Sequence, residues 1–290
     1  MSTAVATPSP PHSRRPRIPA FIAADRGGQV GLVFLVLIVF VALFGPFIAP
    51  HSPNVPIGIP GQGSIGGSPL GLDQLGRDVL SRALSGGRTA LALGALATVA
   101  TYLVGVMLGL LAGYARNTAL DGITMRTVDI FISLPAILVM LVLVTALGGS
   151  SWVLVLGAAV VLFPGVTRIV RTAAAETATR GYVEAAVARG EKRGAILRRE
   201  ILPNIMAPII ADLGVRFSWS IILIASVNFL GLGLSPPASD WGLMISENRS
   251  VIPTNPWAVV APALALVLLI LGVNLLGDAY VRHLGRSSSR

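Results

Sequence analysis

The residues best suited to chemistry lie in one charged stretch, RGYVEAAVARGEKRGAILRREILP, at positions 180–203. It contains the single lysine of the chain, Lys192, with several arginines and glutamates, and apolar runs flank it on both sides. These residue types suit contact with another protein, because small alanines allow close approach and charged groups supply directional pairing. We therefore expect a docking surface here. The alternative is a basic loop that is merely solvated.

Residues that could form a catalytic or metal site are not grouped anywhere else in the chain. There is no cysteine, and the three histidines lie in the tails and in one loop. The sequence contains no Gly-x4-Gly-Lys-Ser/Thr loop, so the chain is not an ATPase of that type. It also offers no Ser/His/Asp constellation for nucleophilic catalysis. We expect no catalytic residue, no metal site and no cofactor in this chain.

The elements that must position the charged stretch are strongly apolar. Hydrophobic residues make up 53% of the chain, charged residues only 12%, and the mean hydropathy is +0.77. Soluble domains carry about a quarter charged residues. The composition therefore predicts an integral membrane protein.

Six segments have about the 20 apolar residues that a bilayer-spanning helix needs. They are residues 29–49, 89–114, 128–147, 152–170, 205–230 and 257–278. The fold class predicted is an all-α membrane protein with six transmembrane helices. The charged stretch at 180–203 falls between the fourth and the fifth of them.

The remaining segments are polar or rich in glycine and proline. Residues 1–28 are expected to be a disordered basic tail and residues 281–290 a second tail. Residues 50–88 form the loop between the first two spans. Within it, residues 71–88 are expected to form an amphipathic helix with Asp73 as its N-cap.

Lysine and arginine are distributed unequally between the two ends of the predicted helices. Seventeen lie in the two tails, the 115–127 connection and the 168–203 segment, and four lie on the other side. Positive residues are retained on the cytoplasmic side of membranes. The count predicts that both termini and the 180–203 loop are cytoplasmic, and it explains the net charge of +9 without nucleic acid.

Two patterns lie inside the predicted spans. Gly105, Gly109 and Gly113 fall on one stripe of the second span, which favours close packing within the chain over homodimerisation. Asp212 and Arg216, four residues apart near the start of the fifth span, are expected to pair locally. A substrate gate is the alternative for this pair.

The charged stretch resembles a known motif. Glu184-Ala185-Ala186-x3-Gly190, followed by Ile201-Leu202-Pro203, is similar to the EAA motif of ABC importer permeases, with the isoleucine one place later than usual. The resemblance implies two short helices joined by a glycine, which form a coupling helix in a cleft of the ATPase subunit. Pro203 is expected to stop the second helix before the fifth span. The residues to which the resemblance assigns coupling are Glu184, Ala185, Ala186, Arg189, Gly190, Leu202 and Pro203.

A second resemblance lies in the loop between the first two spans. The sequence LGLDQLGRDVLSR, at positions 70–82, resembles the LGTDxxGRDxxSR signature of peptide-type permeases, with Leu72 where threonine is usual. The signature residues here are Asp73, Gly76, Arg77, Asp78 and Arg82. We interpret the charged ones as caps and as the pairs Asp73–Arg77 and Asp78–Arg82 of an external helix. Direct contact with a binding protein or substrate is the alternative.

Further short matches at 228–233, 240–242 and 274–278 extend the resemblance over roughly residues 30–282. The chain is thus similar to the C-type membrane subunit of dipeptide/oligopeptide ABC importers, with an ABC type I transmembrane domain at 89–280. The resemblance implies a second homologous permease, two ATP-binding subunits that hold ATP and Mg, an extracytoplasmic substrate-binding protein and a peptide substrate. It also implies a multi-pass protein of the bacterial cytoplasmic membrane.

Three alternatives remain for function. An ABC permease for nickel or another small solute would share the same motifs. An ion-coupled secondary transporter would show ionisable residues at mid-membrane, whereas the charged residues here are expected near the span ends. A membrane scaffold would recruit cytoplasmic proteins through the basic loop without moving a substrate.

Overall fold

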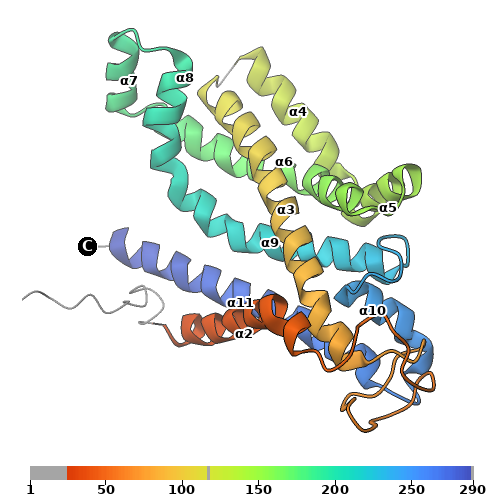
Figure 1. The fold of residues 1–290 in the computed structure, drawn as a ribbon. Coiled ribbons are helices and arrows are strands. Elements are labelled where there is room, and N and C mark those ends of the chain that lie inside the picture. Colours follow the sequence, from red (N-terminus) through yellow and green to blue (C-terminus); the bar gives the residue numbers. More distant parts are fainter. Residues whose placement is uncertain (1–24, 116–117, 289–290) are drawn as a thin grey trace, which may run out of the picture.

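The computed structural model describes residues 25–115 and 118–288, and within them every regular element is helical (Figure 1). The predicted tail at 1–28 lies outside the described residues except for its last four. Residues 281–288, expected to be a tail, instead continue the last helix, because no proline follows Pro262 to break it. The elements that cross or approach the membrane are α2 (Arg26–Ile48), α3 (Val79–Tyr114), α4 (Ala119–Ser133), α5 (Ala136–Leu147), α6 (Ser151–Thr177), α9 (Met206–Phe229) and α11 (Trp257–Ser288).

The number of membrane spans agrees with the sequence. Five helical segments are long and apolar enough to cross a bilayer, and the bent pair α4 and α5 brings the number to six when it is counted as one broken span. The start of α2 lies beside the end of α11, where Arg282 Nη2 is 2.7 Å from Asp25 Oδ2 (Figure 1). Both ends of the described chain therefore meet at one side, as an even number of spans requires.

The third span is not the single helix predicted at 128–147. It consists of α4 and α5, which meet at an angle of 88°. The cause is Pro135, which has no N–H to donate and forces the preceding Leu134 into an extended conformation (φ −85°, ψ 136°). The break leaves a bend in the wall of the helical bundle close to α6 and α9.

The most extensive helix pair is α3 against α6. A Cβ added to Gly105 would lie 2.7 Å from the Cβ of Val166, and one added to Gly109 would lie 2.7 Å from the Cβ of Val170. The glycine stripe thus lets the two backbones approach closely within one chain. The predicted intramolecular packing is confirmed.

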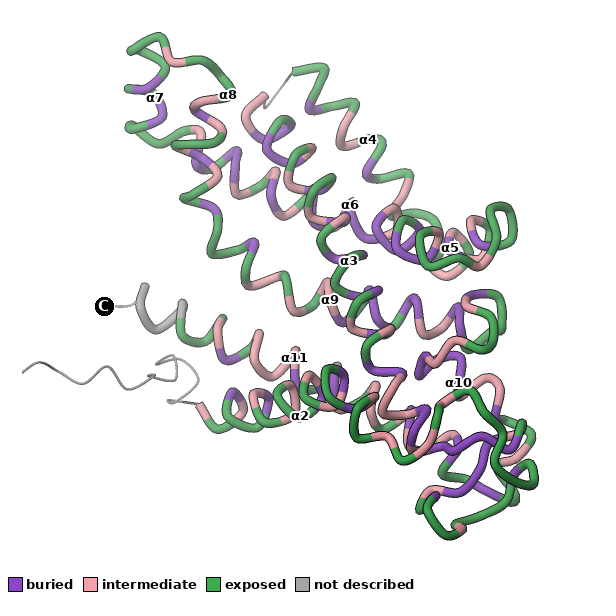
Figure 2. The backbone as a smooth tube through the Cα atoms, viewed as in Figure 1, coloured by how far each residue is buried: buried purple, intermediate pink, exposed green. Residues whose placement is uncertain are grey.

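Buried residues concentrate where α3, α6 and α9 meet, whereas the outer faces of α2, α4 and α5 are exposed (Figure 2). The helix α2 is held against α3 by an unusual contact. Pro46 has no N–H, which leaves the Ala42 carbonyl without its helical donor. Arg88 Nε donates to that oxygen at 3.0 Å. A side chain of α3 therefore satisfies the carbonyl that a proline in α2 leaves free.

Candidate functional site

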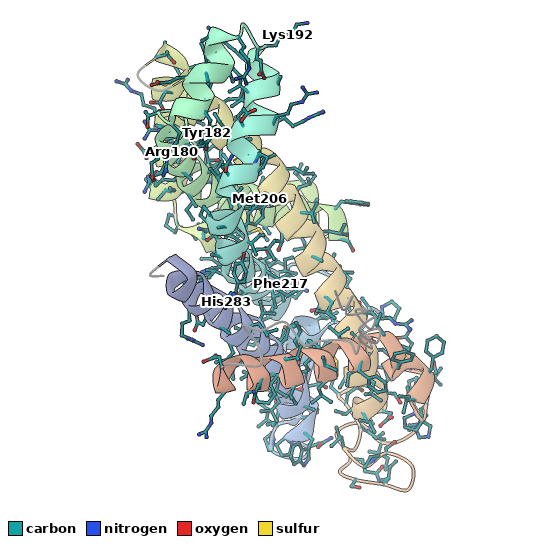
Figure 3. The ribbon with its side chains drawn as sticks, turned by 90° about the vertical axis from the view of Figure 1, so that its left-hand side faces the viewer. Arg180, Tyr182, Lys192, Met206, Phe217 and His283 are labelled. Carbon is teal, nitrogen blue, oxygen red and sulfur yellow. The ribbon has the colours of Figure 1, made fainter. Side chains whose placement is uncertain are left out.

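The charged stretch forms a protruding pair of short helices at one end of the molecule. α7 (Gly181–Ala188) and α8 (Arg193–Ile196) lie at the same end of the molecule as the end of α3 and the start of α4 (Figures 1 and 3). They are joined through Gly190, whose φ of +75° is the left-handed conformation that glycine adopts without penalty. The predicted arrangement of two short helices joined by a glycine is present.

The helix α7 has two distinct faces. Val183 and Ala186 are buried against the body, in a cluster with Ile196 and Ile201 from the segment that follows. Glu184, Ala185 and Arg189 are exposed on the opposite faces. Ala186 is therefore not available for direct contact with a partner, contrary to the reading of both alanines as contact residues. The small side chain of Ala186 lets α7 pack closely against the rest of the protein.

The end of the second short helix differs from the prediction. Pro203 does not stop it, and residues 193–229 run on as one helical segment (Figure 3). The turn before the proline widens into η1 (Leu197–Ile201), where the N–H of Leu202 bonds to the Leu197 carbonyl, and then tightens into η2 (Leu202–Ile205). These turns accommodate a residue that lacks an N–H, so the helix changes its hydrogen bonding without ending.

The contact face of α7 includes apolar residues that sequence reasoning missed. Tyr182 is 41% exposed and Val187 is 53% exposed, although both lie in a protruding polar region. Exposed apolar side chains in such a place are typical of a protein contact surface. Spacing gave no signal for this exposure, because Val187 lies four residues after the buried Val183 and so near the same helical face. The coupling roles of Glu184, Ala185, Arg189 and Gly190 stay predictions.

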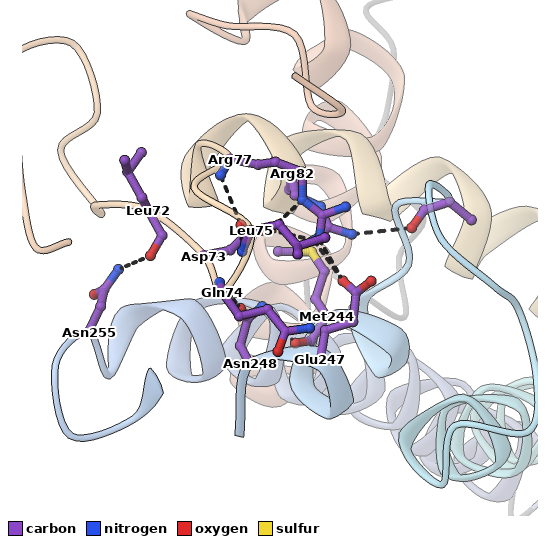
Figure 4. A network of polar contacts seen from close by, with 11 residues as sticks. Leu72, Asp73, Gln74, Leu75, Arg77, Arg82, Met244, Glu247, Asn248 and Asn255 are labelled. Atoms are coloured by element: carbon purple, nitrogen blue, oxygen red, sulfur yellow. Dashed lines mark hydrogen bonds and ion pairs between the residues drawn. The ribbon is translucent and has the colours of Figure 1, made fainter. Parts of the chain in front are cut away.

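The second candidate site is a buried ionic network at the opposite end of the molecule (Figure 4). Asp73 Oδ2 accepts from Arg77 Nε at 2.6 Å and from Arg82 Nη1 at 2.7 Å. Glu247, in α10 (Trp241–Glu247), accepts from the same two arginines at 3.1 and 2.7 Å. All four side chains are nearly inaccessible. Two arginines and two carboxylates thus balance in charge inside the fold.

The expected pairings of the signature are only half right. The Asp73–Arg77 pair is confirmed, but Asp78 does not pair with Arg82. Asp78 instead caps α3 by accepting from the N–H of Ser81 at 3.1 Å, so the N-cap expected at Asp73 is wrong. Residues 71–78 form turns and not an amphipathic helix, because Gly71 and Gly76 both have positive φ. At Gly76 a Cβ would collide with the Gly58 carbonyl.

Neighbouring contacts fasten the same loop to the C-terminal part of the chain. The N–H of Gln74 donates to Asn248 Oδ1 at 2.9 Å. Asn255 Nδ2 donates to the Leu70 carbonyl at 2.9 Å. It also donates to the Leu72 carbonyl at 3.0 Å (Figure 4). The Asp73, Arg77 and Arg82 side chains are buried and paired with one another and with Glu247 inside the fold. The reading of this signature as caps and internal pairs is favoured over direct contact.

The helix α10 is itself anchored by a buried carboxylate. Asp240 Oδ1 accepts from the N–H groups of Gly242 and Leu243 and from Asn228 Nδ2 at 2.8 Å. Burial raises the pKa of Asp240, and these hydrogen bonds act in the opposite direction. Trp241 is fully buried, and its Nε1 donates to the Ala83 carbonyl of α3 at 2.8 Å. The anchor fixes the position of Glu247 at the far end of the same short helix.

Glu247→Ala is expected to lower the stability of the fold by about 3–5 kcal/mol, because two buried guanidinium groups lose a carboxylate partner. Glu176→Ala is a matched control, since it removes an exposed ion pair with Arg180 worth about 0–1 kcal/mol. The measurement is the unfolding midpoint of each purified variant in detergent. Equal midpoints for the two variants would show that the network does not stabilise the loop.

The Asp212–Arg216 pair exists, but its position differs from the prediction. Arg216 Nε donates to Asp212 Oδ2 at 2.9 Å, and the hydroxyl of Tyr102 in α3 donates to the same oxygen at 3.0 Å. Arg216 is the eleventh of the 24 residues of α9. The expectation that charged residues lie only near the span ends is therefore wrong, because Arg216 lies near the middle of α9, which begins at Met206, one residue from the predicted start of the span.

Two family descriptions match the sequence. The family described as "Binding-protein-dependent transport system inner membrane component" matches residues 105–290. The "N-terminal TM domain of oligopeptide transport permease C" matches residues 23–62. Together they cover the two parts of the chain on either side of the signature loop.

Several curated proteins are similar over most of their length. The "Di/tripeptide transport system permease protein DppC" of Pseudomonas aeruginosa (strain UCBPP-PA14) is 37% identical over 263 residues, which is 88% of this chain and 86% of the relative. The "Dipeptide transport system permease protein DppC" of Escherichia coli (strain K12) is 37% identical over 89% of this chain and 88% of the relative. The "Glutathione transport system permease protein GsiD" of Pectobacterium atrosepticum is 35% identical over 85% and 82%.

A solved structure shares the fold. Inward-facing MetNI, a methionine ABC transporter, superimposes with a TM-score of 0.58 at 21% sequence identity. The match covers 69% of this chain and 95% of that one. At this identity the likeness bears on the fold alone.

Proposed function

This chain belongs to the family of binding-protein-dependent transport system inner membrane components, and we propose that it carries di- or oligopeptides across the bacterial cytoplasmic membrane. It is the membrane-spanning permease subunit of an ABC importer. The observation that carries the peptide proposal is the similarity to dipeptide and di/tripeptide permeases along nearly the whole chain. A relative named for glutathione makes a small modified peptide a second candidate within the same class.

The geometry supports a binding surface for separate ATP-binding subunits at the α7–α8 end. The protruding α7–α8 pair offers an exposed face with Tyr182, Ala185 and Val187, and we place the ATP-binding subunits there. ATP and Mg belong to those subunits, and ATP hydrolysis is their reaction. The excess of Lys and Arg supports placing the α7–α8 end in the cytoplasm.

The opposite end supports contact with an extracytoplasmic binding protein. There the end of the loop at 50–78 is tied to α3 and α10 by the Asp73, Arg77, Arg82 and Glu247 network. A rigid loop presents a fixed surface, which lowers the entropic cost of docking. The second permease completes the pathway, because one set of spans encloses only part of it.

In this mechanism ATP closes the pair of ATP-binding subunits, and the movement shifts α7 and α8. The buried contacts of Val183 and Ala186 with Ile196 and Ile201 make the short helices move together with the start of the long helix. The two permeases then exchange between states open to one side and to the other. ATP drives the exchange only through a difference in contacts between those states.

The proposal predicts ATP-dependent uptake of peptides by the reconstituted complex. The chain is co-expressed with a second permease and two ATP-binding subunits, purified as one assembly and placed in proteoliposomes with the binding protein. Uptake of labelled dipeptides and tripeptides, glutathione and nickel is compared with and without ATP. Peptide uptake that needs ATP and survives an ionophore supports the proposal. Uptake of nickel alone, or uptake abolished by the ionophore without a need for ATP, contradicts it.

A further inference from the structure

A charged group faces a pocket in the middle of the membrane domain. We propose that the guanidinium of Arg216 binds the free carboxylate of the transported peptide in the pocket between the α4–α5 bend, α6 and α9. This inference rests on the proposed peptide function and names the group on the peptide that this chain recognises. It concerns a residue outside both the coupling helices and the signature loop.

The hydrogen bonding of Arg216 leaves part of the guanidinium available. Its Nε donates to Asp212, which is also held by the Tyr102 hydroxyl. Within the part of the chain that the structure describes, neither Nη1 nor Nη2 has a hydrogen-bond acceptor. The Arg216 side chain is only 18% exposed. Charged residues within a span pair with a counter-charge, here Asp212, and mark substrate pathways.

The neighbouring backbone is shaped around the guanidinium. A Cβ added to Gly165 of α6 would lie 2.6 Å from Nη1 and 2.8 Å from Cζ of Arg216. Any larger residue at 165 would therefore push the group out of its position. The Asp212 carboxylate fixes the other side of the guanidinium through Nε. The hydrogen bond from Nε to Asp212 and the close packing against Gly165 hold the Nη1 and Nη2 groups in a defined place beside the pocket.

The pocket has the size and chemistry for part of a small peptide. Its volume is about 320 Å³, and Arg216 is the single charged residue among the described residues that line it. The walls include Phe131 and Leu134 at the α4–α5 bend and Trp219 one turn beyond Arg216, and Trp219 is 49% exposed. Apolar walls accept side chains of different shapes without selecting among them. A single cation can select only the group that all such substrates share.

A carboxylate is the ligand that this geometry fits. The guanidinium fork presents parallel N–H donors that match the two oxygens of a carboxylate, and such charge-assisted bonds are strong. Arg216 lies ten residues beyond Met206, about 15 Å along α9. The site is therefore about half way along the helix, where a substrate between the two sides of the membrane would pass.

The test compares a dipeptide that has a free carboxylate with the same dipeptide amidated at its C-terminus. Uptake of labelled Ala-Phe and Ala-Phe-amide is measured in proteoliposomes holding the full importer, with the binding protein saturated by each peptide. Arg216→Gln is expected to lower the ratio of acid to amide uptake by about tenfold or more, the loss typical of a charge-assisted bond. Gly165→Ala, which displaces the guanidinium and keeps its charge, is expected to lower the ratio in the same direction. Arg249→Gln, an exposed arginine at the other end of the molecule, should leave the ratio unchanged.

Two results would overturn the inference while leaving peptide transport in place. One is an equal loss of both peptides in Arg216→Gln, which would assign the residue a structural part. The other is an unchanged ratio in Arg216→Gln and in Gly165→Ala. If the wild-type assembly moves neither peptide, the proposed peptide function fails first and the inference fails with it.

Discussion

Gly190→Val is expected to reduce ATP-driven uptake by about tenfold or more, whereas Gly190→Asn is expected to retain most of it. The reason is the backbone and not the available space. Gly190 has a φ of +75°, and a Cβ added there meets nothing within 4 Å. Both side chains therefore fit, but a β-branched residue is strained in this conformation and asparagine tolerates it. Relief of the strain would change the angle between α7 and α8.

The measurement separates coupling from assembly. Each variant is purified with its partner subunits, and ATP hydrolysis and peptide uptake are followed in the same proteoliposomes. We expect Gly190→Val to assemble and to hydrolyse ATP with little uptake. Equal uptake by the valine and asparagine variants would mean that the left-handed turn does not matter for coupling. Loss of assembly in both would assign Gly190 to subunit binding.

Gly109→Leu is expected to prevent stable folding of the permease. A Cβ at this position would lie 2.7 Å from the Cβ of Val170 and 2.8 Å from the Thr167 carbonyl, so the contact involves backbone that cannot easily shift. Overpacking of a close-packed interior costs about 1–3 kcal/mol for small additions. Leucine adds four carbons between two helices in direct contact. We expect the free-energy cost of this overpacking to exceed the free energy gained by packing α3 against α6.

The matched control is Gly122→Leu in α4, where an added Cβ meets nothing within 4 Å. Leucine is a better helix former than glycine, so this variant should fold as well as the natural chain. Membrane-inserted yield and the elution profile in detergent distinguish the two. Normal yield and a single sharp elution peak for Gly109→Leu would contradict the packing of α3 on α6.

The parts of the fold that sequence predicted are those set by local spacing. The stripe of Gly105, Gly109 and Gly113 places three small residues on one helical face, whatever the partner helix is. Gly190 was assigned to the turn between two short helices by the resemblance to the EAA motif, and its φ of +75° agrees with that assignment. Six spans follow from hydropathy, because each apolar run must cross the bilayer by itself.

The predictions that were wrong concern features set by contacts between distant residues or by a single residue within an apolar run. Pro135 was visible in the sequence, but the apolar residues around it hid the break between α4 and α5. Glu247 was not identified because its partners Arg77 and Arg82 lie more than 160 residues earlier. Asp73 and Asp78 both precede a helix in sequence, and only the turns at Gly71 and Gly76 decide which of them is the cap.

The helical segment from Arg193 to Phe229 has a mechanical consequence. Its 37 residues correspond to about 55 Å, enough to join the α7–α8 end to the far side of the membrane domain. Under the proposed mechanism a displacement of α8 would be transmitted along this segment, in which Arg216 lies roughly two thirds of the way from Arg193 to Phe229. The helical hydrogen bonding of this segment changes at the wide and tight turns beside Pro203. Movement carried along one continuous segment needs no separate relay of side chains between α8 and Arg216.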